Sequence, residues 1–543
     1  MIAFRLLTLI AVGCIIPMSA PARATSVAEN LSAQCYSSQE LDRYRLLRRL
    51  SLDLRQQLPS YEEYLALDDE SDIPKALIDD WLASDAFRQT MRRFHEDLLW
   101  PSLNGVSLTD VNARIAIQNA RYVLLGQGRK RTFRGGNGTQ TCGNFEQTEF
   151  NPDGSPIPRE ETTPDGLPFQ QDGWVWVEPY WAPGTQVQVC AFDAQAASVG
   201  QFADCATLDG MSDPKCGCGP NLRHCYGEGA ESAFRDDMRE QLGRLVDDIA
   251  VGGRPYSELV TTRRQWVNGR YEFWRKYMGP MVSINKTWNV PGPGDAPTSE
   301  APSFSDLEWR LVERSGHHAG VQTMPAFLLR FQTNRSRANR FRTVFTSQYF
   351  VPAEGAAAEG CSDDTTDLTN RCVCQTCHQV LEPLAAHFAE FVEAGLSAFD
   401  HDIYPVNHDT CANLEQLPEP QRRRIAATCR RFYVMEDGEP NIGTLIPWQY
   451  ADGDGQLHQT IAANIASGPL GLGESTIASG LFHTSTVRNM FRFLMGRDMN
   501  LDPTDALNEL DLLSDIATEF QVHDDLTQLV ATLIDLPQYR RIR

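Results

Sequence analysis

Two cysteines and a histidine occur only once in this chain in the order C-x-x-C-H, in the run Cys374-Gln375-Thr376-Cys377-His378. Two thiols at this spacing can each add across a vinyl group of a haem, and the histidine that follows is then placed to ligate the iron. The run therefore predicts one covalently attached haem c, with Cys374 and Cys377 as its anchors and His378 as the proximal iron ligand.

A C-x-x-C pair has two other common uses. It can be half of a zinc site, but zinc takes four nitrogen or sulfur ligands, usually including a second closely spaced pair. The next cysteines, Cys411 and Cys429, are eighteen positions apart and supply no such pair. The pair can also form a disulfide or a redox-active dithiol, and neither needs a histidine. The adjacent histidine therefore favours haem attachment over both.

Residues 1–24 have the pattern of a secretory signal peptide. Arg5 precedes an apolar run from Leu6 to Met18, and Ala22-Arg23-Ala24 is a small-x-small cleavage site. A lipoprotein-type site before Cys14 is the alternative, which the apolar run beyond Cys14 disfavours. No later segment has 18 consecutive apolar residues, so we expect no membrane span. We therefore expect a periplasmic or otherwise exported protein.

The composition agrees with export and argues against one class of partner. The chain has 14 cysteines, which in an exported protein indicates an oxidising compartment and disulfides. Its formal net charge is −22, and an acidic surface repels phosphate backbones, so we expect no nucleic acid partner. A length of 543 residues allows several domains with sizeable cores.

Apolar residues recur at three- and four-residue steps over most of the chain, which is the period of an amphipathic helix. Leu46, Leu50 and Leu54 show this period, and Ser60 with Glu63 is typical of a helix start. We therefore expect a mainly α, multi-domain fold. After the signal peptide, its expected parts are an N-terminal helical domain (25–127), a Cys-rich insertion (128–230), a helical region (231–345), a haem-attachment region (346–445) and a C-terminal helical domain (446–543).

The insertion differs from the rest of the chain in its many glycine, proline and aromatic residues. Segments 174–177 and 187–190 alternate as strands do, so we expect an irregular, strand-containing unit. Its six cysteines favour a disulfide framework, and a zinc or iron–sulfur centre assisted by His224 is the alternative. These cysteines are Cys142, Cys190, Cys205, Cys216, Cys218 and Cys225. Without the signal peptide and the haem anchors the chain has eleven cysteines, so one thiol is left over or pairs outside the chain.

A six-coordinate haem iron needs a second axial ligand, usually methionine or histidine. Met324 lies in a loop before a predicted helix and is the first candidate, with apolar packing as its alternative role. His317 and His318 are close to it in sequence. His387 is a fourth candidate, on a helix that we expect to start at Glu382-Pro383-Leu384 and to run to Gly395.

Two further features flank the haem motif. The four cysteines Cys361, Cys372, Cys411 and Cys429 surround it and can form two bracketing disulfides. A basic run precedes it and can meet haem propionates or an acidic partner, although an exposed helix face is the favoured interpretation. This run contains Arg330, Arg335, Arg337, Arg340 and Arg342.

Several blocks of the chain resemble, in order, a known group of proteins. They are residues 49–54, the block Thr323-Met324-Pro325-Ala326-Phe327-Leu328, the haem motif with Glu382-Pro383-Leu384, and residues 487–497. This order resembles the planctomycete-type cytochrome c-like exported bacterial proteins over about two thirds of the chain. Those proteins usually have Asp-Pro-Leu-Gly where this chain has Glu382-Pro383-Leu384-Ala385. The resemblance implies Cys374 and Cys377 as thioether anchors and His378 as proximal ligand, but no substrate, because the group is mostly of undefined function.

The sequence thus predicts an exported, mono-haem c-type cytochrome-like protein that transfers one electron to or from a partner protein. It favours an electron carrier over a stand-alone enzyme. Two alternatives belong to other classes: a peroxidase-like haem enzyme with an open sixth position, and a disulfide-stapled binding or scaffold protein without haem. No Ser-His-Asp order or carboxylate pair predicts a hydrolase site. The sequence identifies neither the redox partner nor the oligomeric state.

Overall fold

The fold is known from a computed structural model of the chain. It describes residues 40–68, 70–109, 113–118, 121–124, 145–201, 205, 213, 215–227, 229–279, 301–314, 318–350, 361–363, 368–393, 395–396, 398–399, 404–435, 442–446 and 456–541. The expected signal peptide, with Cys14, lies outside the described residues, as do Cys35, Cys142 and His317.

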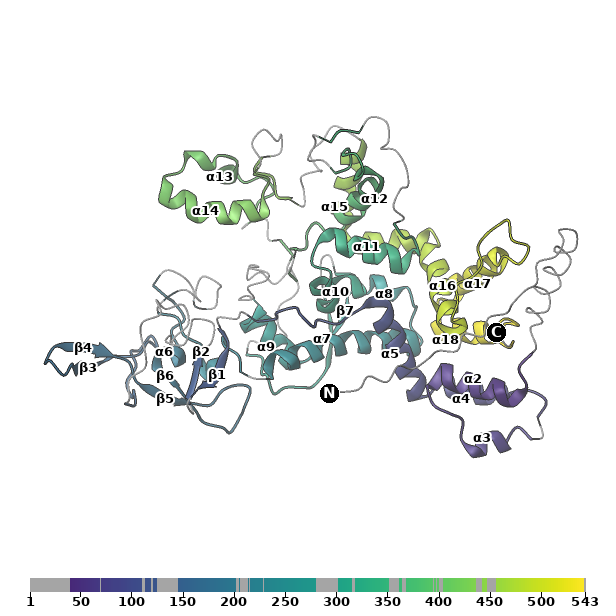
Figure 1. The fold of residues 1–543 in the computed structure, drawn as a ribbon, viewed down its shortest axis with the longest axis horizontal. Helices are drawn as coiled ribbons and strands as arrows, with labels where there is room; N and C mark the ends of the chain where they lie inside the picture. The colour runs from purple at the N-terminus through teal and green to yellow at the C-terminus, as the bar shows by residue number, and fades with distance from the viewer. Residues whose placement is uncertain are drawn as a thin grey trace, which may run out of the picture.

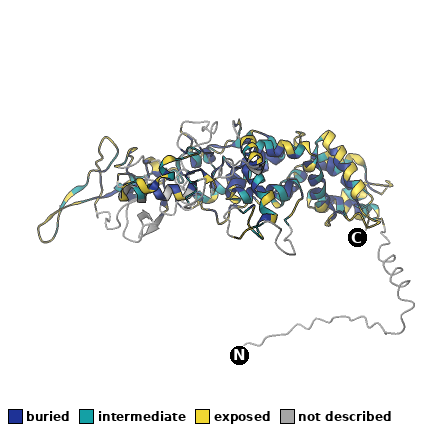
Figure 2. Cartoon of the chain, turned by 90° about the horizontal axis from the view of Figure 1, so that it is seen from above, coloured by how far each residue is buried: buried dark blue, intermediate teal, exposed yellow. Residues whose placement is uncertain are grey.

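The protein is mainly α-helical and consists of several structural units, as expected. About 49% of it is helical, and its strands form only short antiparallel pairs. The strand-containing unit lies at one end, on the left in Figure 1, and the C-terminal helices lie at the other. Figure 2 shows that buried residues concentrate along the middle of the helical part. None of the described helices is long and apolar enough to cross a membrane.

Four helices form the N-terminal unit: α2 (Arg43–Arg55), α3 (Tyr61–Leu65), α4 (Lys75–Leu82) and α5 (Asp85–Leu99). Helix α3 begins where the sequence predicts it, because Ser60 and Glu63 form a capping box: each side chain accepts the backbone N–H of the other residue. The leucines of α2 at the predicted period are buried.

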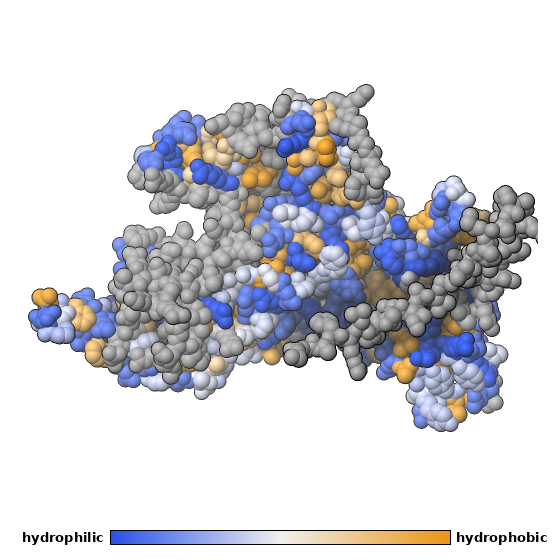
Figure 3. Space-filling view, in the orientation of Figure 1, coloured by the Kyte–Doolittle hydropathy of each residue, from blue (hydrophilic) through white to orange (hydrophobic). Residues whose placement is uncertain are grey.

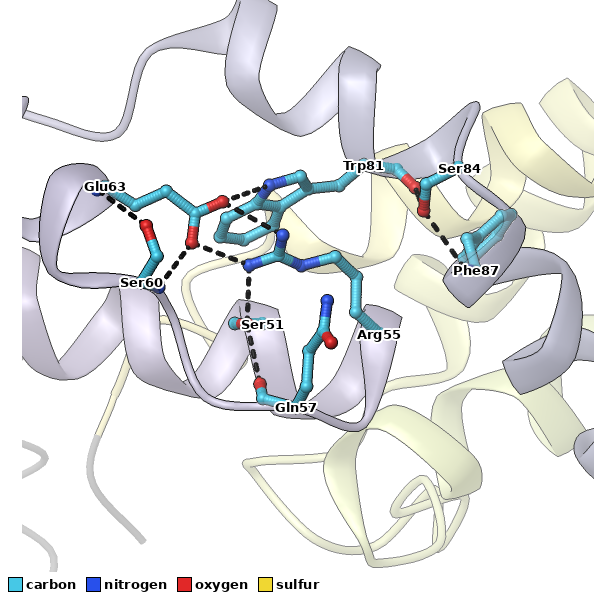
Figure 4. Close-up of polar contacts among 8 residues, drawn as sticks. All are labelled: Ser51, Arg55, Gln57, Ser60, Glu63, Trp81, Ser84 and Phe87. Atoms are coloured by element: carbon cyan, nitrogen blue, oxygen red, sulfur yellow. Dashed lines mark hydrogen bonds and ion pairs between the residues drawn. The ribbon is translucent and has the colours of Figure 1, made fainter.

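One carboxylate joins three of these helices (Figure 4). Arg55 donates from both terminal nitrogens to the two oxygens of Glu63, at 2.9 and 3.0 Å. Trp81 Nε1 donates to Glu63 Oε1 at 3.1 Å, and the Arg55 guanidinium lies 3.8 Å from the centre of the Trp81 ring. A bidentate arginine pair of this kind has a fixed geometry, so Glu63 sets how α2, α3 and α4 pack together.

The described part of residues 113–230 contains six strands of four residues each, in three antiparallel pairs. They are β1 (Ile115–Gln118) with β2 (Arg121–Leu124), β3 (Arg159–Thr162) with β4 (Pro168–Gln171), and β5 (Trp174–Val177) with β6 (Val187–Cys190), after which comes the short helix α6 (Ala191–Ala194). The predicted strands 174–177 and 187–190 are therefore present. β1 and β2 lie within 25–127, a range expected to be helical, so strand structure begins earlier than the sequence predicts.

The cysteines of the insertion form the disulfide framework favoured by the sequence. Cys205 bonds to Cys216, and Cys218 bonds to Cys225. Cys190 is disulfide-bonded as well. His224 contacts the Tyr277 carbonyl oxygen through Nδ1 at 3.2 Å. In the described parts of the chain, no three His, Cys, Asp or Glu side chains come together as a metal site.

Helical structure resumes after the insertion. The elements are η3 (Pro220–Leu222), α7 (Ala230–Val246), η4 (Asp247–Val251), α8 (Glu258–Thr261), β7 (Arg264–Val267), α9 (Gly269–Tyr277), β8 (Arg310–Glu313), η6 (Gly320–Thr323), α10 (Pro325–Arg330) and α11 (Asn334–Phe345). Strands β7 and β8 pair with each other. A second core between the insertion and helices α7 and α9 includes Phe234, Tyr271 and Trp274.

The last part of the chain contains α12 (Gln375–Ala386), α13 (Asp409–Ala412), η7 (Leu414–Gln416), α14 (Glu419–Phe432), α15 (Gln456–Ala478), α16 (Leu481–Met495), α17 (Leu510–His523) and α18 (Leu526–Ile534). Helix α16 ends at Gly496, which caps the helix with a φ of 64°, a value that glycine adopts readily. Helices α13 and α14 project from the body (upper left in Figure 1) around a small core of their own that contains Phe432 and Tyr433.

The main core joins both ends of the chain. It includes residues from α2, α5, α7, α8, α10, α11 and α15–α18, and none of its members is a cysteine. The two chain ends also meet through polar contacts. Arg49 donates to the Tyr539 carbonyl oxygen at 2.7 Å, and the Tyr539 hydroxyl donates to Asp53 at 2.8 Å. Burial of apolar side chains in this core is what holds these helices together, and we call them the body of the protein.

Candidate haem-attachment site

The three residues of the haem motif lie together at the start of α12. Cys374 is the residue that precedes the helix, and the backbone N–H groups of Cys377 and His378 both donate to its carbonyl oxygen, at 3.2 and 3.0 Å. Residues three and four apart share a helix face, so both sulfurs and the imidazole project from the same side. All three side chains are partly exposed. A flat ligand can reach them from solvent.

Cys374 and Cys377 are free thiols, whereas the other described cysteines are in disulfides. Cys361 bonds to Cys372 and Cys411 bonds to Cys429, so the two bracketing disulfides suggested by the sequence are present. These four neighbouring cysteines are therefore bonded to one another. The thiols of the motif remain available for covalent attachment, which is what addition to a haem requires.

A strained turn precedes the motif. Val373 has a φ of 67°, and the N–H of Cys374 donates to the carbonyl oxygen of Cys372 at 2.7 Å, which together define a classic γ-turn. A positive φ is unfavourable for a β-branched residue and costs on the order of 1–3 kcal/mol. The Cys361–Cys372 disulfide holds the residue before this turn in place.

Apolar side chains beside the thiols are exposed. Val373 is 83% exposed and Val380, in the second turn of α12, is 43% exposed. Figure 3 shows apolar residues on the surface at the end of the molecule formed by α12 and α15. The residues present therefore fit a haem: two free thiols, one histidine and two exposed apolar side chains beside them.

His378 is held by a carboxylate one turn further along α12. Its Nδ1 lies 2.5 Å from Glu382 Oε1, and Arg335 Nε of α11 donates to the same oxygen at 2.6 Å. Glu382 is buried. Because Nδ1 is engaged by the carboxylate, Nε2 is the nitrogen that can ligate a metal.

The interpretation of the basic run as an exposed helix face is wrong for Arg337, whereas Arg330 is exposed and the other three arginines are partly exposed. Arg337 is fully buried and donates to carbonyl oxygens at the end of α10 and in the segment after α12; burial lowers its pKa to about 10. Arg340 donates to the Leu98 carbonyl oxygen. Arg342 lies close enough to Cys377 for the two to interact electrostatically, and its Nη1 is buried without a hydrogen-bond partner. Arg337 is turned inwards because it binds carbonyl oxygens that would otherwise be unsatisfied.

The described candidates for the second axial ligand make other contacts. Met324 is buried and faces an apolar pocket lined by Leu99, Leu242, Val321 and Phe327, none of which belongs to α12. This is the packing role that the sequence offered as its alternative. His318 is buried with its ring 6.0 Å from that of Phe391.

His378 lies in the first turn of α12, and His387 follows the last residue of the same helix. Nine residues at 1.5 Å each place the two about 13 Å apart along α12 and on opposite faces, so they do not suit one iron. His387 Nδ1 instead contacts the Gly468 carbonyl oxygen at 3.0 Å and Ser467 Oγ at 3.1 Å. Burial lowers the pKa of His387 to about 4.

The expected start of a helix at Glu382 is also wrong. Helix α12 begins at Gln375, contains Pro383 within it and ends at Ala386. A proline inside a helix leaves the carbonyl four residues earlier without its N–H donor; here that residue is Gln379, which is exposed to water. The sequence analysis also missed Glu382 as a partner of His378. The four-residue spacing between the two was the signal that could have identified it.

No protein-family model, no curated protein and no solved structure matches this chain.

Proposed function

We propose that this protein is an exported, mono-haem c-type cytochrome-like protein that exchanges one electron with a partner protein. A single observation carries the proposal: the two free thiols among the described cysteines share one helix turn with a histidine whose Nε2 can ligate iron. The same residues support membership in the planctomycete-type cytochrome c-like group. The disulfides are those expected of an oxidising compartment, and a periplasm is the one we propose.

The attachment chemistry follows from the residues present. Cys374 and Cys377 would hold the haem by adding across its vinyl groups: each addition would form one carbon–sulfur bond and place the thiol hydrogen on the other vinyl carbon, with no net oxidation. His378 would hold the metal through the Nε2 lone pair, while Glu382 holds Nδ1. When bound, the haem would supply a one-electron ferric/ferrous couple, which is reduced by a partner protein that donates an electron and oxidised by one that accepts it.

The test compares three forms of the full chain produced with a cytochrome c maturation system. We expect a haem-stained band on a denaturing gel for the wild type and for Cys411→Ala/Cys429→Ala, but none for Cys374→Ala/Cys377→Ala. The control variant also removes two cysteines, and it leaves the motif intact. Absence of covalent haem from the wild type, or its retention without both motif thiols, would overturn the proposal. The stapled scaffold without haem would then be the better interpretation.

A second candidate function is a peroxidase-like haem enzyme with an open sixth position. Two observations favour it: Met324 faces a pocket away from α12, and a carboxylate on Nδ1 makes an imidazole ligand more basic. Visible spectra separate the two functions. A low-spin reduced spectrum supports the electron carrier, and a high-spin spectrum that shifts on addition of peroxide or cyanide supports the enzyme.

A further inference from the structure

The contact between His378 and Glu382 is part of a three-residue arrangement that links two helices. His378 Nδ1 and Arg335 Nε both approach one carboxylate oxygen, Glu382 Oε1, at 2.5 and 2.6 Å. The Glu382 side chain is 5% exposed and that of Arg335 is 40% exposed. The carboxylate is therefore held between the imidazole inside the site and a guanidinium at its edge.

We infer that Glu382 is a positioning residue for the haem ligand and that Arg335 opposes its electrostatic effect, so that together the two set the reduction potential of the site. The inference rests on the proposed function. It concerns residues that the haem motif does not include, and it assigns opposite roles to the two members of one ion pair.

The positioning role follows from hydrogen-bond chemistry. An ionised carboxylate can only accept hydrogen bonds, so the short contact places the imidazole hydrogen on Nδ1 and leaves the lone pair on Nε2. Glu382 itself has little freedom because it is buried and on the same helix as His378. The imidazole is thus held in one tautomer and one orientation before any metal binds.

The electrostatic role follows from charge. A negative group on Nδ1 increases electron density on the ligating imidazole and stabilises the ferric state, which carries one more positive charge than the ferrous state. The positive guanidinium of Arg335 donates to the same oxygen, so it weakens the effect of the Glu382 charge on the imidazole. Loss of the Glu382 charge should therefore raise the reduction potential, and loss of the Arg335 charge should lower it.

A purely structural ion pair between α11 and α12 makes a different prediction. If the pair only held the two helices together, removal of either charge would lower stability, and the reduction potential would not move in opposite directions. The sign of the change in potential therefore separates the two roles.

The experiment uses the full haem-loaded chain and the variants Glu382→Gln and Arg335→Gln. Glutamine keeps an oxygen that can accept the Nδ1 hydrogen bond, so Glu382→Gln removes charge more than shape. The ion pair of Arg497 and Glu509 provides matched controls, Glu509→Gln and Arg497→Gln, because its side-chain exposures of 43% and 9% are similar. Its two hydrogen bonds are 2.7 and 2.8 Å long, and it does not belong to α11 or α12.

Redox titration gives the reduction potential. For Glu382→Gln we expect at least a tenfold shift of the equilibrium towards the ferrous form, about 59 mV upwards for one electron. For Arg335→Gln we expect a shift downwards, and for both controls no shift beyond twofold.

An unchanged potential in Glu382→Gln, or shifts of the same sign in the two variants, would overturn the inference while leaving haem attachment intact. Controls that shift as much as the two variants would overturn it too. A wild-type chain that carries no covalent haem on the gel would instead overturn the proposed function. The two failures are therefore distinguishable.

Discussion

In the insertion, the described cysteines are all disulfide-bonded, whereas the main core of the helical body contains no cysteine. The strands of the insertion are four residues long and pair only two by two, so they bury little apolar surface among themselves. The helices of the body bury a continuous apolar core instead. The difference shows that this chain uses covalent cross-links where the apolar core is thin, and packing where it is thick.

Helix α12 combines features of both regions. It packs against α11 and α15, while exposed apolar residues and free thiols lie at and near its N-terminal end. The segment on its N-terminal side is closed by the Cys361–Cys372 disulfide, and the segment on its C-terminal side is held by Arg337. The candidate site is therefore supported by both kinds of device.

The largest effect expected in the body comes from Arg337→Met. Arg337 donates to five backbone carbonyl oxygens, those of Leu328, Phe331, Phe391, Val392 and Gly395. Its loss leaves buried acceptors unsatisfied, and we expect the free energy of unfolding to fall by about 4 kcal/mol. Denaturant titration followed by circular dichroism measures this change.

The matched control is Arg422→Met. Arg422 is partly exposed and pairs with Glu415 and Glu419 at the surface, so we expect a much smaller loss than for Arg337→Met. Equal losses in the two variants would mean that Arg337 is not the anchor of the segment after α12.

The next effect tests the insertion. Cys218→Ala/Cys225→Ala opens a disulfide between residues seven positions apart. A loop of this size is worth about 2–3 kcal/mol in the chain-entropy account, so we expect the insertion to lose that much stability while the body keeps its own. Hydrogen exchange followed by mass spectrometry reports on both regions in one sample. Faster exchange in α16 and α17 of the variant would show that the two regions unfold as one unit, contrary to the comparison.

The third effect is a pH dependence of opposite sign in the two regions. Burial lowers the pKa of His95 and of His387 in the body to about 4, so between pH 6.5 and 4 the unfolded chain binds more protons than the folded chain. Stability of the body therefore falls on acidification through this window, by up to about 1.4 kcal/mol per pH unit for each histidine. Burial raises the pKa of Asp172 in the insertion to about 6, so there the folded state binds the extra proton and acidification stabilises it.

Segment-resolved hydrogen exchange at pH 7, 6 and 5, corrected for the intrinsic exchange rate, checks both signs. His95→Gln removes one titrating group, and we expect the body to lose about half of its pH dependence in this window. Asp172→Asn should remove the stabilisation of the insertion by acid. The same slope in both regions would contradict the assignment of these groups.

Much of the helical frame could be predicted from local signals. The leucine period of α2, the Ser60–Glu63 capping box and the glycine that ends α16 each act within a few residues, so they can be recognised in sequence. Predictions from the sequence fail where a residue contacts segments that are far away along the chain. Arg337 looks like a surface residue in a basic run, and only the carbonyl oxygens of two other segments explain its burial.

For the candidate site, the sequence by itself determined the donors: two thiols and a histidine at fixed spacing, which any helix would place on one side. Tertiary structure alone decided that the other described cysteines are in disulfides, that Met324 faces a pocket that α12 does not line, and that Arg335 of α11 reaches the carboxylate beside His378. The physical reason is that spacing along a chain fixes geometry over one or two turns. Contacts between α11 and α12, or between distant cysteines, depend on how whole helices pack.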